Sequence, residues 1–122
     1  MRADNKGFTL VELIVVILVL GILSAIAISR FVSLKESAYI ASMKADLRNF
    51  ALYEQNYATD NPGYFSGNGA AQGFVHTPGV TITAVADPGP PPSWHATATH
   101  DKTPATCQIV TNGPAIWDIS CP

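Results

Sequence analysis

An apolar run near the N-terminus, with a single charged residue near its start, limits what this 122-residue chain can fold into more than any other feature. As a helix, residues 8–28 would be about 31 Å long, which matches the hydrocarbon core of a bilayer. The rest of the chain is long enough for one compact domain, and such a domain cannot enclose a helix of this length. We therefore predict a hydrophobic transmembrane helix over residues 8–30 and one globular head over residues 31–122.

The charges before the apolar run indicate its orientation. Arg2 and Lys6 outnumber Asp4, so the leader is expected to stay in the cytoplasm and the head to face outward. An ordinary secretory signal also begins with a basic leader, and its cleavage site would fall near residues 24–27. A secreted protein and a monomeric membrane-anchored binding domain therefore remain as alternatives.

Glu12 is the one charged residue between Phe8 and Ile28. An ionised carboxylate inside a membrane costs a few kcal/mol, so it is expected to have a partner and a function. A position near the end of the span would also let the side chain reach the headgroups. If the chain were cut between Gly7 and Phe8, the new α-amino group of a neighbouring subunit would supply a cation for Glu12.

The sequence KGFTLVEL at residues 6–13 resembles the processing signature of type IV pilins and type II secretion pseudopilins. The resemblance implies that a prepilin peptidase removes a leader of residues 1–7 by cutting after Gly7, and that it methylates Phe8. It further implies that Phe8 and Glu12 direct assembly of a homo-oligomeric helical filament at an inner-membrane platform.

The rest of the chain predicts an α+β fold. Apolar residues at helical spacing over residues 31–58 indicate that the helix continues, although the family often has a proline where this chain has Ser29. A loop over residues 59–78 and alternating β-favouring runs over residues 79–122 predict a small antiparallel sheet. We expect the amphipathic half of the helix to cover this sheet, as the resemblance also implies. The predicted inward positions are Phe31, Leu34, Ala38, Ala41, Ala45, Leu47, Phe50 and Ala51, with Lys44, Asp46 and Arg48 among the polar ones.

Two cysteines, Cys107 and Cys121, lie close to the C-terminus. They are predicted to form one disulfide outside the cytoplasm, with two free thiols as the alternative. The bridge would restrain a terminus that otherwise frays.

Several classes of function find no support in the residues. The net charge of −2 provides no basic patch for nucleic acid, which an assembled filament could still bind. His95 and His100 are predicted on opposite faces of a strand, so we expect no metal site. No cofactor-binding or catalytic motif appears, and we expect no enzyme.

We therefore expect a structural subunit of a type IV pilus that serves adhesion, twitching motility or DNA uptake. As a precursor it would lie in the inner (cytoplasmic) membrane, and after assembly at the cell surface. A type II secretion pseudopilin is the alternative, and the pair of cysteines near the C-terminus favours the pilin.

Overall fold

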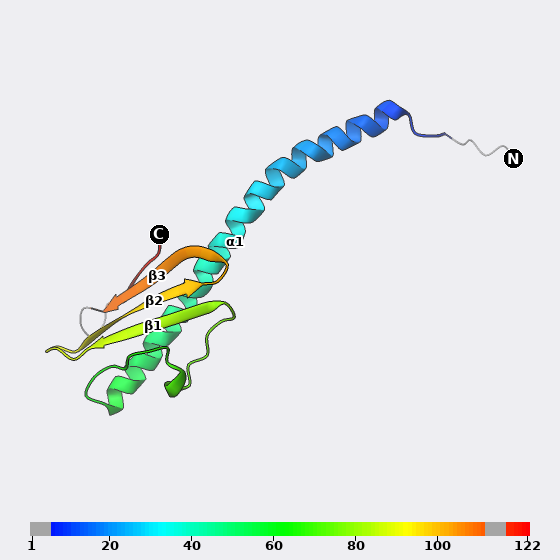
Figure 1. Ribbon diagram of the computed structural model, residues 1–122. Helices are drawn as coiled ribbons and strands as arrows, with labels where there is room; N and C mark the ends of the chain where they lie inside the picture. Colours follow the sequence, from blue (N-terminus) through cyan, green and yellow to red (C-terminus); the bar gives the residue numbers. More distant parts are fainter. Residues whose placement is uncertain (1–5, 112–116) are drawn as a thin grey trace. The chain divides into compact units, whose positions relative to one another are not determined.

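The computed structural model describes residues 6–111 and 117–122 and has an α+β fold (Figure 1), as predicted. The chain divides into two compact units. The first ends at Lys35, and the second covers Glu36–Pro122. The elements are α1 (Leu10–Asp60), the 3₁₀ helix η1 (Ala70–Gln72), β1 (Val80–Asp87), β2 (Ser93–His100), β3 (Thr103–Thr111) and β4 (Trp117–Ser120).

The first unit contains the N-terminal part of α1, whose side chains are all exposed in the single subunit. By length and composition, α1 contains a stretch that is long and apolar enough to cross a membrane. The helix is continuous through Ser29, whose hydroxyl donates to the carbonyl of Ile26 at 2.9 Å. The Ser24 hydroxyl donates to the carbonyl of Leu20 at 2.7 Å. Both hydroxyls are thus satisfied within the helix, which suits an apolar environment.

The second unit carries a four-stranded antiparallel sheet in the order β1-β2-β3-β4. The register places Ala84 beside Ala96, Ala96 beside Ile109, and Ile109 beside Ile119. Buried and exposed residues alternate along β1, β2 and β3, which confirms the predicted half-buried sheet. The segment 112–116 lies outside the described residues, and with it the turn that the sequence Asn-Gly-Pro at residues 112–114 predicts.

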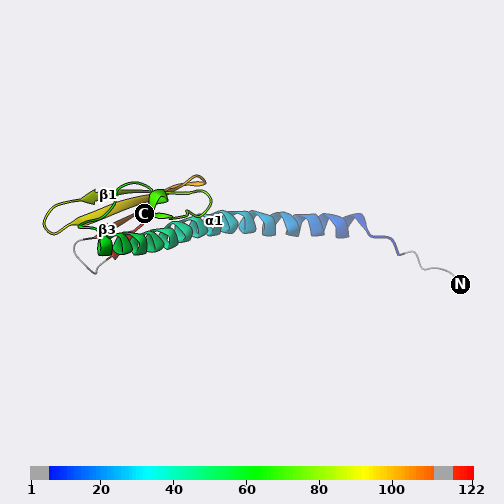
Figure 2. The same cartoon turned by 90° about the horizontal axis from the view of Figure 1, so that it is seen from below.

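The core of the second unit lies between α1 and the apolar face of the sheet (Figure 2). The helix contributes the large, fully buried side chains of Met43, Leu47 and Phe50. The strands face it with smaller residues such as Ala96 and Ala98. Large side chains on the helix can therefore interdigitate with small ones on the sheet, which is how a close-packed core forms.

The inward face of α1 differs in part from the prediction. Leu47, Phe50 and Ala51 are buried as expected, and Met43 is buried as well. The other predicted inward residues are exposed: Phe31, Leu34, Ala38, Ala41 and Ala45. Asp46 was expected on a polar face, yet it is only 5% exposed. Alanines fit several helix faces equally well, and so their spacing alone did not identify the buried one.

The glycine-rich loop is tied to the edge of the sheet. The backbone N–H of Gly67 donates to the carbonyl of Ala84 at 2.9 Å, and the N–H of Ala84 donates back at 2.8 Å. Gly69 has a φ of 76°, and a Cβ added there would lie 2.9 Å from Phe50 and Phe74. Only glycine fits this position, and the loop covers part of the β1 edge.

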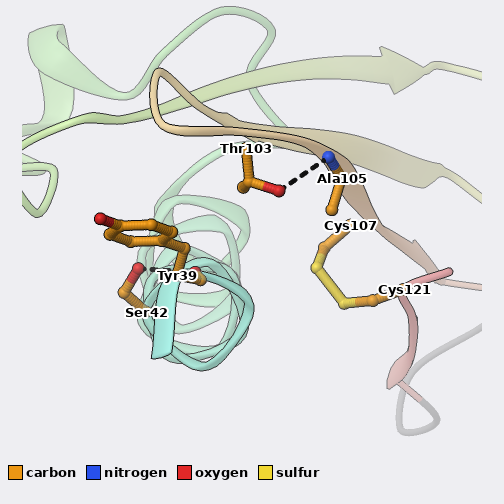
Figure 3. The surroundings of a disulfide bond; sticks show 6 residues. All are labelled: Tyr39, Ser42, Thr103, Ala105, Cys107 and Cys121. Atoms are coloured by element: carbon orange, nitrogen blue, oxygen red, sulfur yellow. Dashed lines mark hydrogen bonds between the residues drawn. A yellow bond between two sulfur atoms is a disulfide. The ribbon is translucent and has the colours of Figure 1, made fainter. Parts of the chain in front are cut away.

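The two cysteines form a disulfide, with Cα atoms 4.3 Å apart. Figure 3 shows Cys107 on β3 joined to Cys121, which follows β4, with Tyr39 and Ser42 of the helix nearby. Cys107 is fully buried in the core and Cys121 packs against it. The bridge therefore anchors the C-terminal residues to the core.

Candidate processing and assembly site

A reciprocal pair of hydrogen bonds between Thr9 and Glu12 defines the start of α1. The backbone N–H of Glu12 donates to Thr9 Oγ1 at 3.2 Å, and the backbone N–H of Thr9 donates to Glu12 Oε2 at 3.0 Å. The backbone N–H of Leu13 donates to the carbonyl of Thr9 at 3.3 Å. Thr9 is thus the N-cap of a capping box, in which threonine and glutamate satisfy each other's backbone donors.

The capping box gives Glu12 a role within its own subunit that sequence reasoning missed. The signal was present, because threonine followed three residues later by glutamate is typical of a helix start. The carboxylate also lies in the first turn of α1, near the positive end of the helix dipole. Within the described residues, Oε2 binds Thr9 and Oε1 accepts no hydrogen bond. Glu12 therefore keeps one oxygen for a further partner.

The predicted cleavage position lies just before this cap. Gly7 and Phe8 precede the helix and are exposed, and Phe8 is 87% exposed. A Cβ added at Gly7 would meet no atom within 4 Å, so nothing in the single subunit requires glycine there. A non-helical, accessible backbone is what a peptidase needs in order to bind the chain.

The head contains two buried carboxylates that sequence reasoning also missed. Asp46 accepts hydrogen bonds from the backbone N–H and the hydroxyl of Thr77, both at 2.7 Å. Glu54 is fully buried, and its Oε2 accepts a hydrogen bond from the backbone N–H of Phe65 at 3.0 Å. Its Oε1 is buried without a partner among the described residues. Burial raises the pKa of Glu54 to about 7, and the hydrogen bond from Phe65 opposes this shift.

The histidines do not come together. His95 is exposed on β2, whereas the ring of His100 stacks on Tyr39 with a centroid separation of 4.4 Å. In the part of the chain that the structure describes, no three His, Cys, Asp or Glu side chains are placed to hold a metal ion.

Comparison with known proteins points to the same N-terminal segment. Residues 2–28 match the family described as the prokaryotic N-terminal methylation motif. Similar proteins include the type II secretion system core protein G of Pseudomonas aeruginosa, 32% identical over 77 residues. Two others are pilus major components of Thermus thermophilus: narrow-pilus PilA5, 56% identical over 45 residues, and wide-pilus PilA4, 33% identical over 85 residues. No solved structure gives a significant match.

The matches cover 63%, 37% and 67% of this chain, and they span 54%, 37% and 65% of the three relatives. A methylation motif leading into a long apolar helix, followed by a small antiparallel sheet, defines a prepilin-type chain. These findings support the family of type IV pilins and type II secretion pseudopilins for this chain.

Proposed function

We propose that this protein is a structural subunit of a type IV pilus, with no catalytic activity of its own, that polymerises through the N-terminal part of α1. The observation that carries the proposal is the exposed apolar surface of the first unit, where Leu10 is 73% exposed and Val19 is 47% exposed. A surface of this kind requires a membrane or neighbouring copies to cover it. The methylation motif and the two pilus relatives support the filament as its final environment.

In this proposal the chain has three functional parts. Residues 1–7 are a leader that remains in the cytoplasm, residues 8–30 span the inner membrane, and residues 31–122 form the head outside. A prepilin peptidase cleaves between Gly7 and Phe8 and methylates the new amino group. A methylated amine keeps its positive charge, as methylated lysine does. The mature subunit then moves from the membrane into a surface filament at an assembly platform.

The geometry of the capping box supports a specific role for Glu12 in assembly. Oε2 is held by the backbone of Thr9 in the same subunit, so the carboxylate has a defined position before assembly. Oε1 is then available for the α-amino group of Phe8 on a neighbouring subunit. A charge-assisted hydrogen bond of this kind is stronger in an apolar surrounding than in water. The pair would thus favour docking of the helix into the filament.

Two substitutions separate this pairing from helix capping. Glu12→Gln keeps a side chain that can accept the Thr9 hydrogen bond, because glutamine also serves in a capping box, but it removes the charge. Glu12→Ala removes both. We expect both variants to insert into the membrane and to yield few sheared filaments. If Glu12→Gln assembles normally while Glu12→Ala does not, the ion pair is wrong and capping alone explains the glutamate.

Processing is tested by intact and peptide mass spectrometry of protein sheared from the cell surface. We expect a chain that starts at Phe8 with one added methyl group and lacks two hydrogens because of the Cys107–Cys121 disulfide. A chain that retains residues 1–7, or one that begins after Ala25, would contradict the proposal.

A type II secretion pseudopilin is the second candidate, because one relative is a core protein of a type II secretion system. Deletion of the gene separates the two functions. Loss of surface filaments with normal protein secretion is expected for a pilin, and the opposite phenotype would support the pseudopilin.

A further inference from the structure

A hollow beside the C-terminal end of α1 combines aromatic rings with polar side chains. Its volume of about 330 Å³ falls at the lower end of the range for small-molecule sites, roughly 300–1,000 Å³. The lining residues are Tyr53, Asn56, Tyr57, Asp60, Asn61 and Gln72. The first four follow one another at positions i, i+3, i+4 and i+7 of the helix and therefore share one face. Gln72 belongs to η1, so the hollow lies between the helix and the glycine-rich loop.

Both tyrosine rings are held in place by buried phenylalanines. The ring of Tyr53 meets Phe74 edge to face at 5.3 Å, and the ring of Tyr57 meets Phe65 at 5.4 Å. Phe65 and Phe74 each contact Phe50 in the centre of the core. The orientation of the tyrosines is thus set before a ligand arrives, which lowers the entropy that binding must overcome.

The polar groups around the rings are available for hydrogen bonds. The side-chain N–H of Asn61 donates to the carbonyl of Tyr57 at 2.9 Å, which positions the amide and leaves its oxygen for a ligand. The side chains of Asn56, Asp60 and Gln72 form no hydrogen bond with other described residues, and neither do the two tyrosine hydroxyls. Such a set offers both donors and acceptors.

The chemistry of the lining indicates the class of ligand. A purely apolar ligand would cover the amides and the carboxylate without satisfying them, which is costly. An anion would face Asp60, and the lining contains no lysine or arginine to balance it. A sugar ring has an apolar C–H face for the tyrosines and hydroxyl groups at its edge for the amides and Asp60. We propose that this hollow binds a neutral saccharide.

This proposal is independent of filament assembly. The six lining residues lie within residues 53–72 of the second unit, and Phe8 and Glu12 are not among them. Binding can therefore be measured on the unassembled full chain. Failure of the saccharide proposal would leave the pilin proposal intact, and failure of assembly would not affect the binding measurement.

The test is isothermal titration of the full chain in a polyoxyethylene-ether detergent, which has neither a sugar nor an ammonium headgroup. The probes are maltotriose, cellotriose and chitotriose, with choline chloride as a cationic competitor because aromatic residues beside a carboxylate can also bind ammonium groups. We expect at least one trisaccharide to bind saturably. Asn56→Ala and Asp60→Ala should each weaken that binding by roughly tenfold, the effect of losing one hydrogen bond to a ligand.

Gln55→Ala is the matched control, because Gln55 is the exposed neighbour of Asn56 on the same helix and does not line the hollow. It should bind with unchanged affinity. If thermal unfolding shows that Asp60→Ala weakens the head, Gln72→Ala is measured in its place and the same loss is expected, because it also removes one polar side chain from the lining. Three results would overturn the proposal: no saturable binding of any trisaccharide, unchanged affinity in both lining variants, or displacement of the sugar by choline at equal concentration.

Discussion

Replacing Glu54 with glutamine should make the head more stable at neutral and alkaline pH. Glu54 is fully buried, and its pKa is raised from 4.5 to about 7 by burial. Because the folded protein holds a proton that the unfolded chain releases above about pH 4.5, the free energy of unfolding falls as the pH rises from about 4.5 to about 7. Above that window the loss is complete.

The size of the effect follows from the shift in pKa. A difference between 4.5 and about 7 corresponds to about 3 kcal/mol, since each pKa unit is worth roughly 1.4 kcal/mol. Glutamine has nearly the same shape and can still accept the hydrogen bond from the backbone N–H of Phe65. It cannot ionise, so Glu54→Gln should remove this part of the pH dependence. At pH 8 the variant should exceed the wild type by about 3 kcal/mol, and near pH 4.5 the two should be similar.

Urea unfolding of the full chain in detergent, followed by tryptophan fluorescence, measures this difference, because Trp94 is buried in the core. Glu36→Gln is the matched control: Glu36 lies on the same helix and is exposed, so its replacement should leave the pH profile unchanged. The reasoning is refuted if the difference in free energy of unfolding between the Glu54→Gln variant and the wild type is the same at pH 4.5 and at pH 8.

Three further changes test other contacts. Thr9→Ala should reduce the stability of the helix start by about 1 kcal/mol through loss of the cap, with faster hydrogen exchange at the backbone N–H of Glu12. Serine at both Cys107 and Cys121 should lower the free energy of unfolding by about 3 kcal/mol, because the unfolded chain is no longer closed into a loop of about 15 residues. Gly69→Ala should lower the thermal midpoint, since its positive φ and the nearby phenylalanine rings exclude a methyl group.

Each of these has a result that would contradict it. Unchanged exchange at Glu12 in Thr9→Ala would show that the capping box does not hold the helix start. A double serine variant as stable as the wild type would mean that the disulfide adds nothing to the folded head. A Gly69→Ala variant with an unchanged midpoint would show that the loop can move away from the core.

Local patterns made most of the fold predictable. The apolar run and the lack of proline before Pro62 predicted a helix that indeed extends to Asp60, because length, hydropathy and helix breakers are read from adjacent residues. The alternation of apolar and polar residues predicted the strands, because successive side chains of a strand point to opposite faces and this pattern is also read from adjacent residues. Within the range predicted for the sheet, β3 begins at Thr103, although Pro104 directly after it argues against a strand interior.

Burial of the acidic residues could not be predicted in this way. A carboxylate on a helix usually marks a solvent-facing side, and what reverses that expectation is a partner distant in sequence. Phe65 is 11 residues from Glu54, and Thr77 is 31 residues from Asp46, so both partners become neighbours only after the loop folds onto the helix. The candidate processing site depended on local sequence and was visible from it, although the capping role of Thr9 was overlooked.

The hydroxyls of Ser24 and Ser29 have a mechanical consequence for the proposed filament. Each hydroxyl donates to a carbonyl of its own helix, so neither needs a hydrogen-bond acceptor from a neighbouring subunit. Dispersion contacts between such helices are individually weak and have little directional preference. Under tension, adjacent helices could then slide along one another and exchange one set of contacts for an equivalent set. A bundle built in this way would yield to tension along its sides, and the ends of its helices would act as the fixed points.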